Sequence, residues 1–394
     1  MTPTAASLRP SAPAASGKVR FSIILPHREK FGPDGAGAVA MIVHRLASAG
    51  SRHPARVIGP AFEGEIFPGH DFVPVQVPGW LPLNPTQSYA LSVASAVGGL
   101  PPGPLEVHNK PDVALRLARA FPRLPVTLFL HNDPRTMRGA RSGRARLALL
   151  DRLAAVVTVS SFVRNALLDG IDPPARRVPL VIHNAVDLAS LPAPLPPEAR
   201  EKLILFAGRV VPDKAPDAFV AACARALPQL PGWRASVIGA DGFSAASAET
   251  PFIRQLRPAA AAAGVEMVGH LPHGEVLEAM ARAAIVVVPS RWEEPFGLSA
   301  LEAMASGAAL ACSGRGGLAE VAAEACLRFD PDDVEQGAAA LIRLAWDDAL
   351  RTNLSAAGSQ RVRDRFGLAE AVARLDALRD RVLAAWTSSR RDLR

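Results

Sequence analysis

At 394 residues, of which 49% are hydrophobic, the chain is too long for one ordinary core and suits two domains. Its three cysteines lie in apolar segments without CxxC spacing, which argues against a disulfide framework or a zinc site and favours a reducing cytosol. The formal net charge is +7, but a single tyrosine and no interleaving of aromatic with basic residues argue against nucleic acid binding.

The N-terminal region begins with a stretch rich in Pro, Ala and Ser. Residues 1–17 lack a long apolar core, so we expect a disordered leader rather than a signal peptide. A strand over 19–25 and a helix over 38–48 follow. No run in the sequence approaches the ~20 apolar residues that cross a bilayer.

The loop between this strand and helix is rich in glycine. Read as Gly35-x-Gly37-x-x-Ala40, it imitates a dinucleotide fingerprint. The fit is poor, because Gly35 comes ten residues after Leu25 and no acid ends the next strand near Val57. A plain turn remains the alternative reading.

Two further strands end in histidine. After a helix near 86–96, the strand at 105–107 is followed by His108, and the strand at 126–130 is followed by His131. A histidine at the carboxyl end of a parallel strand points into the crevice where α/β sheets bind ligands. Both histidines are therefore site candidates, with an ordinary polar role as the alternative.

The positive charge belongs to the first half of the chain. Residues 1–200 carry 22 Lys and Arg against 13 Asp and Glu, whereas residues 201–394 carry 22 against 24. Such a surplus attracts an anionic surface or substrate, although a solvated arginine-rich helix is an equal alternative. The arginines that crowd one segment are Arg135, Arg138, Arg141, Arg144, Arg146 and Arg152.

The first sheet is predicted to close with strands over 155–159 and 178–182. Ser160 or Ser161 is a good N-cap for a helix over 162–168, and we favour this capping role. A proline-rich linker follows. The expected division is a leader at 1–17, a first domain at 18–190, a linker at 191–200, a second domain at 201–366 and a final helical segment at 367–394.

The second domain opens with a strand over 203–207 and a loop that carries two cations, Arg209 and Lys214. Further strands are expected at 235–238, 265–268, 285–288, 310–312 and 327–329, and helix from 334 onward. Asp330-x-Asp332 imitates a metal-binding pair. We reject a metal there, because Asp332 or Asp333 suffices as the cap of the next helix.

The most informative stretch is 284–307, which predicts a strand, a polar loop and a helix that begins at Leu298 and stops at Gly307. In one continuous helix, Glu294 and Glu302 would lie roughly 80° and about 12 Å apart. Pro295 instead places Glu294 in the loop, so the two acids flank one elongated ligand. The amides of Phe296, Gly297 and Leu298 would be free donors for a phosphate between them.

This stretch resembles the E-x7-E region of the retaining nucleotide-sugar glycosyltransferases of the GT-B fold, specifically glycosyltransferase family 4. The resemblance implies an α/β chain with two doubly wound Rossmann-like domains that face each other across a cleft. It also implies that Glu294 holds the transferred sugar, that Glu302 holds the nucleotide ribose, and that Phe296, Gly297 and Leu298 meet the sugar and diphosphate through their backbone.

Other positions match the family pattern in order. The resemblance implies that Arg209 and Lys214 bind the phosphates, that His131 lies over the transferred sugar, and that His270 and Leu271 pack against the base. Gly316, Gly317 and Glu320 fit a GG-x-x-E element, whereas Ala185 departs from the usual Asn-Gly-Val-Asp. The last helix, over 368–386, is expected to cross back onto the first domain. The acceptor side would comprise Gly35, Gly37, His108, Arg135 and Arg138.

The implied function is retaining transfer of a hexose from a nucleotide diphosphate donor, UDP rather than GDP, to an acceptor hydroxyl. Metal and cofactor are not expected. The acceptor would be an anionic glycan or lipid-linked molecule of cell-surface polysaccharide or lipopolysaccharide synthesis. The enzyme would be cytoplasmic, with peripheral contact to the anionic inner face of the membrane.

Three other functions remain as alternatives: a GT-B sugar-nucleotide epimerase, a nicotinamide-dependent dehydrogenase and a non-catalytic carbohydrate-binding module. The combination of Arg209, Lys214, Glu294 and Glu302 disfavours the second and the third.

Overall fold

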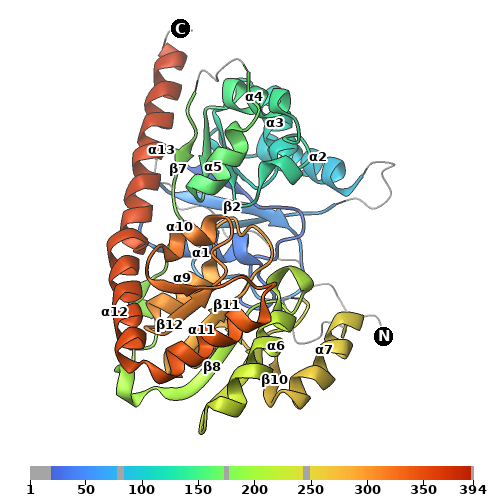
Figure 1. Cartoon of the computed structure of the whole chain (residues 1–394). Helices are drawn as coiled ribbons and strands as arrows, with labels where there is room; N and C mark the ends of the chain where they lie inside the picture. Colours follow the sequence, from blue (N-terminus) through green and yellow to red (C-terminus); the bar gives the residue numbers. More distant parts are fainter. Residues whose placement is uncertain (1–18, 78–83, 173–176, 243–248, 392–394) are drawn as a thin grey trace, which may run out of the picture.

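A computed structural model of the chain describes residues 19–77, 84–172, 177–242 and 249–391, so the leader expected over 1–17 lies outside the described part. Two parallel sheets with helices around them form two stacked α/β domains (Figure 1). The predicted architecture of two doubly wound domains is confirmed.

The first sheet has the strand order β3-β2-β1-β4-β5-β6-β7, and every pairing is parallel. Its strands are β1 (Phe21–Ile24), β2 (Ala55–Pro60), β3 (Phe72–Val75), β4 (Leu105–His108), β5 (Val126–Leu130), β6 (Ala155–Thr158) and β7 (Leu180–Val181). The helices of this domain are α1 (Ala38–Ser48), α2 (Pro85–Gly98), α3 (Pro111–Ala120), α4 (Gly143–Arg152) and α5 (Ser161–Leu168). Strands β4 and β5 are buried along their whole length, as expected of central parallel strands.

The second sheet has the order β10-β9-β8-β11-β12-β13, again with parallel pairings only. Its strands are β8 (Glu201–Ala207), β9 (Arg234–Ile238), β10 (Val265–Gly269), β11 (Ala283–Val288), β12 (Ala309–Cys312) and β13 (Cys326–Arg328). The helices are α6 (Pro216–Ala226), α7 (Pro251–Ala262), α8 (His273–Arg282), α9 (Leu298–Ala305), α10 (Gly317–Ala322) and α11 (Val334–Trp346). The β-branched run of β11 is entirely buried at the centre.

Each sheet has a switch point, where the strand order reverses and a crevice forms at the carboxyl ends. In the first sheet the switch point lies between β1 and β4, and in the second it lies between β8 and β11. The residues that follow these four strands are therefore the natural candidates for ligand contacts.

Two C-terminal helices connect the domains. Helix α12 (Asp348–Arg365) packs on α9 of the second domain, and α13 (Leu368–Arg391) then runs the length of the first domain, at the left of Figure 1. The guanidinium of Arg379, only 2% exposed, donates two hydrogen bonds of 2.9 and 2.7 Å to the buried carboxylate of Glu106 on β4. Trp386 Nε1 donates to the carbonyl of Arg123 at 2.7 Å.

The expected elements differ from the structure at a few points. The helix expected near 86–96 is confirmed as α2, and Ser160 caps α5 by accepting a hydrogen bond from the amide of Val163. The strand expected over 178–182 is only the two-residue β7. Strand β3 was not predicted, because its FVPV sequence is short, partly exposed and interrupted by proline.

Candidate active site

Lys214 and Glu294 meet at the switch point of the second sheet. Lys214 ends a short 3-10 turn after β8, and Glu294 lies in the loop after β11. The Lys214 Nζ and Glu294 Oε1 atoms are 2.5 Å apart, and Ser290 Oγ donates to the same oxygen. Glu294 is 4% exposed. The loop geometry therefore brings together one cation and one acid that the sequence separates by 80 positions.

Gly297 shapes the turn into α9. Its φ of +104° is in the region that favours glycine, and a Cβ there would lie 3.0 Å from the Leu318 side chain. No backbone hydrogen bond within the described residues is donated by the amides of Phe296, Gly297 or Leu298. These three N–H groups remain available at the start of the helix, where an anion is favoured.

Glu302, on the second turn of α9, is held from both domains. Its Oε1 atom accepts hydrogen bonds from Arg45 Nη2 of α1 at 2.8 Å and from His273 Nε2 of α8 at 3.0 Å. Burial acts to raise the pKa of Glu302, but the hydrogen bond from His273 and the charge of Arg45 outweigh it and hold the pKa below its ordinary value. Glu302 is therefore an ionised acceptor.

The other donor-side candidates lie along the same edge of the second sheet. Arg209 follows β8 after Gly208 and is half-buried. His270 and Leu271 follow β10, two strands further out, and are also half-buried. The neighbouring His273, rather than His270, contacts Glu302.

His108 and His131 form a buried pair at the carboxyl ends of β4 and β5. His108 Nδ1 lies 2.9 Å from His131 Nε2, and the His108 ring stacks on Phe129 with centroids 4.6 Å apart. Burial lowers the pKa of His131 to about 4 and that of His108 well below its usual value, so both rings are neutral near pH 7. The His131 Nδ1 atom is buried and has no hydrogen-bond partner.

The two domains are joined by hydrogen bonds beside this site. Ser160 Oγ donates to the Pro295 carbonyl at 2.6 Å. The Glu320 carboxylate accepts from the amide of Ser161 at 2.7 Å, from the Ser161 hydroxyl at 3.0 Å and from His183 Nε2 at 2.8 Å. Burial acts to raise the pKa of Glu320, but these partners lower it overall. The sequence indicated Glu320 as part of a motif, but not as an interdomain contact.

Of the two predicted acceptor-side glycines, Gly37 lies against the Glu29 carboxylate and Gly35 lies near the Lys30 side chain. Gly37 is the N-cap of α1, and Gly35 has a φ of +78°. The Glu29 carboxylate accepts hydrogen bonds from the amides of Gly37 and Ala40, the latter at 3.2 Å. In this structure a carboxylate of the chain itself therefore occupies the start of α1.

Several arginines of the cluster form ion pairs or hydrogen bonds within the first domain. Arg135 pairs with Asp133 at 2.8 Å and Asp169 at 3.2 Å, and Arg138 Nε lies 3.7 Å from Asp112. Arg146 is buried, and its guanidinium donates to the backbone carbonyls of residues 140, 141, 167 and 169. The remaining members, Arg141, Arg144 and Arg152, are exposed.

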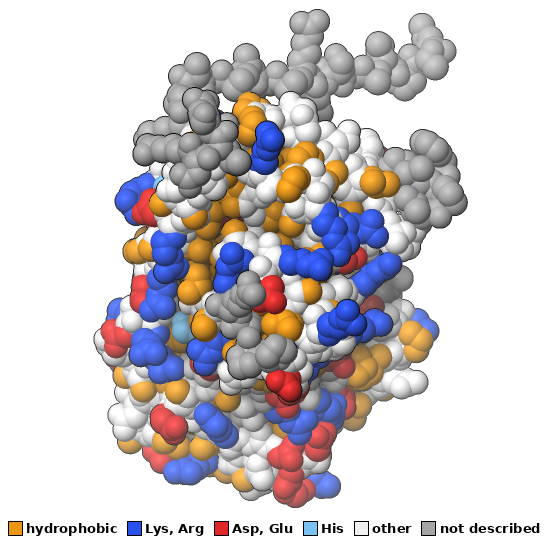
Figure 2. All heavy atoms as spheres, turned by 90° about the horizontal axis from the view of Figure 1, so that it is seen from above, with side chains coloured by type: hydrophobic (Ala, Val, Ile, Leu, Met, Phe, Trp, Pro, Cys, Tyr) orange, Lys and Arg blue, Asp and Glu red, His pale blue; other side chains and the backbone are white. Residues whose placement is uncertain are grey.

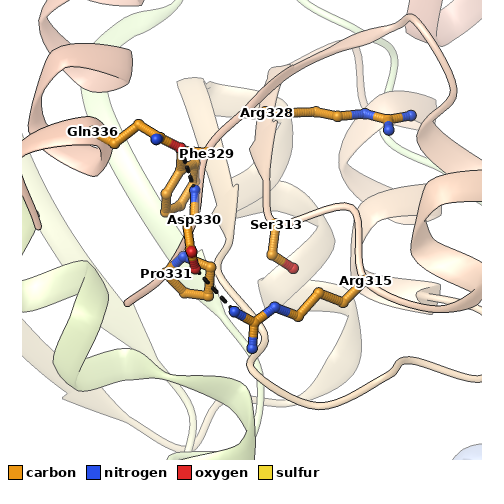
Figure 3. Close-up of a pocket in the computed structure, with 7 residues that line it drawn as sticks. All are labelled: Ser313, Arg315, Arg328, Phe329, Asp330, Pro331 and Gln336. Atoms are coloured by element: carbon orange, nitrogen blue, oxygen red, sulfur yellow. Dashed lines mark hydrogen bonds and ion pairs between the residues drawn. The ribbon is translucent and has the colours of Figure 1, made fainter. Parts of the chain in front are cut away.

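Two hollows lie beside the site rather than between Lys214 and Glu302. One, of about 310 Å³, is at the ends of β12 and β13, where the Arg315 guanidinium and the Asp330 carboxylate point toward each other at 2.9 Å (Figure 3). Asp332 also pairs with Arg315 and with Arg291. These ion pairs account for the Asp330-x-Asp332 pattern. The second hollow, of about 480 Å³, lies between Arg135 and α5 of the first domain.

The chain is similar to a family model and to several curated proteins. Residues 190–361 match the family model described as "Glycosyl transferases group 1". The Bacillus subtilis protein YtcC, named as a glycosyltransferase, is 25% identical over 318 residues, which are 76% of this chain and 77% of that protein. Other curated relatives, with names such as glycogen synthase and D-inositol 3-phosphate glycosyltransferase, are 31–38% identical, but the matches cover only 25–50% of their length.

Solved structures share the architecture at low sequence identity. Sucrose-phosphate synthase from Thermosynechococcus elongatus has a TM-score of 0.76 at 20% identity, covering 93% of this chain and 100% of that one. Anabaena HepE in complex with UDP and glucose has a TM-score of 0.70 at 17% identity, covering 90% and 97%. These likenesses establish the GT-B fold.

Proposed function

Since the chain is a hexosyltransferase with the GT-B fold, we propose that it transfers a hexose from a nucleotide diphosphate donor to an acceptor hydroxyl with retention of configuration. The observation that carries the proposal is the meeting of Lys214 with Glu294, which comes just before the available amides at the start of α9 in the same loop. A cation, an acid and phosphate-binding donors then lie within one loop cluster.

The proposed roles follow from charge. As the bond from sugar to diphosphate breaks, negative charge develops on the leaving phosphate, and Lys214, Arg209 and the helix amides stabilise it without a metal. Glu294 holds the hydroxyls of the sugar, and Glu302 holds the ribose. The acceptor attacks from the face that the diphosphate leaves, and the leaving phosphate takes the acceptor's proton. This one-face reaction needs no covalent nucleophile.

His131 contributes as a neutral group. Its buried, unpartnered Nδ1 atom is a suitable hydrogen-bond partner for a hydroxyl of the transferred sugar. The lowered pKa keeps the ring uncharged near neutral pH, so it positions the sugar rather than stabilising an anion.

The proposed donor is a UDP-sugar rather than a GDP-sugar. The fold likeness to a protein crystallised with UDP and glucose supports this preference. We place the reaction in cell-surface polysaccharide or lipopolysaccharide synthesis, with a glycan or lipid-linked acceptor at the cytoplasmic face of the membrane.

Exposed arginines support the membrane part of this proposal. Figure 2 views the molecule from the end that carries α4 and shows Lys and Arg side chains around an area of hydrophobic ones. Among the described residues, no helix has both the length and the apolar character needed to cross a bilayer. Liposome flotation tests the contact: vesicles with anionic lipid should carry the protein upward and neutral vesicles should not, and equal flotation or none would contradict it.

Titration with UDP and assay with UDP-glucose test the chemical proposal. Lys214→Met should lose about tenfold or more in UDP affinity, because a charge-assisted contact to phosphate is removed. Glu294→Gln should keep most UDP affinity but lose about 100-fold in transfer, because the sugar is no longer held in place. Lys202→Met, an exposed lysine on β8, is the matched control and should leave both unchanged. Equal turnover in wild type and Glu294→Gln would refute the assigned role.

A further inference from the structure

The switch point of the first sheet carries a second pair of polar residues. Strands β1 and β4 are parallel neighbours, with Ile24 opposite Val107. His27 follows β1 and Lys110 follows β4, and the two lie close enough that the charge of Lys110 adds to burial in lowering the pKa of His27. Both residues lie beyond the carboxyl ends of their strands, where open α/β sheets bind ligands.

Neither group is satisfied within the domain. The His27 Nδ1 atom is buried and has no hydrogen-bond partner, and the ring lies beside Tyr89 with centroids 6.1 Å apart. Lys110 is half-buried, and no hydrogen bond or ion pair joins its ammonium to any other residue that the structure describes. Burial is the main cause that lowers the pKa of Lys110 and the charge of Arg28 lowers it further, whereas the charges of Asp112 and Glu29 act to raise it.

The nearby carboxylates are already engaged elsewhere. Glu29 accepts the amides at the start of α1, and Asp112 accepts the amide of Val113 at 3.0 Å while facing Arg138. Arg28, next to His27, is exposed and adds positive charge. The crevice therefore has a half-buried ammonium in no direct ion pair with a described residue, beside a neutral hydrogen-bonding ring, an arrangement that favours an anion carried on a polar molecule.

We infer that His27 and Lys110 form the acceptor subsite and that the acceptor carries a phosphate or carboxylate group. The inference rests on the proposed function, since the donor would occupy the matching switch point of the second sheet. Lys110 would pair with the anionic group, and His27 would hydrogen-bond to it or to an adjacent hydroxyl. The next strand, β5, ends at His131, so the acceptor would extend from Lys110 toward the proposed reaction centre.

Calorimetric titration of the full chain saturated with UDP tests the subsite, because UDP blocks the phosphate contacts of the second domain. The probes are glucose 6-phosphate, glucuronate and methyl glucoside. We expect the two anionic sugars to bind at least about tenfold more tightly than methyl glucoside. Lys110→Met should remove this preference, whereas Lys30→Met, an exposed lysine near the same loop, should keep it.

A fourth probe, hexyl phosphate, separates two sources of the anionic group. Binding as tight as that of glucose 6-phosphate would identify a lipid-borne phosphate, and weaker binding would identify a sugar phosphate. His27→Gln provides a second test if Lys110→Met does not fold. This variant should bind glucose 6-phosphate more weakly than the wild type and should bind UDP equally well.

The inference is overturned if glucose 6-phosphate binds equally to wild type and Lys110→Met, or no better than methyl glucoside to wild type. If the wild type does not bind UDP at all, the result instead contradicts the proposed function, so the two failures are distinguishable.

Discussion

Single residues in this protein owe their chemistry to burial. The His108 and His131 rings lie at the ends of adjacent strands, where the sheet excludes water and the charged form of imidazole is disfavoured. The pair is therefore a neutral hydrogen-bonding unit. Because the buried rings resist protonation, they have a cost in folding stability at acid pH.

That cost predicts a pH dependence. The pKa of His131 is about 4 in the folded chain against an ordinary value of 6.5. Between these values the unfolded chain binds a proton that the folded chain does not, so stability falls as the pH falls from about 6.5 toward 4. In His131→Gln, the free energy of unfolding from urea titrations should decline less between about pH 7 and about pH 5. An equal decline in both proteins would show that His131 does not titrate this way.

At this scale the sequence was informative about residues that follow strands but not about their partners. The spacing of Glu294 and Glu302 around Pro295 indicated two acids on either side of a helix start, and the structure places them there. The partners of Glu302 were missed, because Arg45 is 257 positions away and meets it only through the packing of two domains. His273 carried no signal beyond its closeness to His270.

Among the elements, α13 has a role that its sequence only partly reveals. Its apolar positions Leu375, Leu378 and Val382 pack with Phe21, Phe129 and Val157 of the first sheet. Arg379 is buried on this face and pairs with Glu106. A charged pair in the middle of an apolar contact depends on both partners being present.

Removing one partner should therefore be severe. Arg379→Met leaves the Glu106 carboxylate buried without its cation and should lower the free energy of unfolding by about 3–5 kcal/mol in urea titrations. Arg374→Met is the matched control on the same helix. Its pair with Glu370 is exposed on both sides, so the change should stay within about 0.5 kcal/mol. Similar values for the two variants would mean that Glu106 does not need Arg379.

Element types were predictable where apolar runs were long and ended clearly. The apolar runs of β5 and β11 predicted central strands, and Ser160 and Asp333 mark helix starts by capping. Strand β3 was not predicted, and β7 is shorter than predicted. Both are edge strands, which need fewer buried residues and are defined mainly by pairing with their neighbour.

At the level of the whole molecule, the two domains touch next to the proposed site through apolar side chains and through a set of interdomain hydrogen bonds. Glu320 alone receives three hydrogen bonds from the first domain. Interdomain contacts of this kind permit relative motion, and their loss shifts the balance toward an open form.

Glu320→Ala should open the molecule. Small-angle X-ray scattering should give a larger radius of gyration for this variant than for wild type, and saturating UDP should reduce the difference. Glu324→Ala, an exposed acid four positions along the same segment, should match wild type. An unchanged radius in Glu320→Ala would mean that the remaining contacts suffice to hold the domains together.

The ion pair between Arg45 and Glu302 has a thermodynamic consequence. One carboxylate serves both as the bridge between the halves and as the proposed anchor of the nucleotide, so the two equilibria are linked and reciprocal. Any change that separates the two domains, including one on α13, should weaken the apparent donor affinity in proportion to the fraction of molecules that it removes from the binding-competent form.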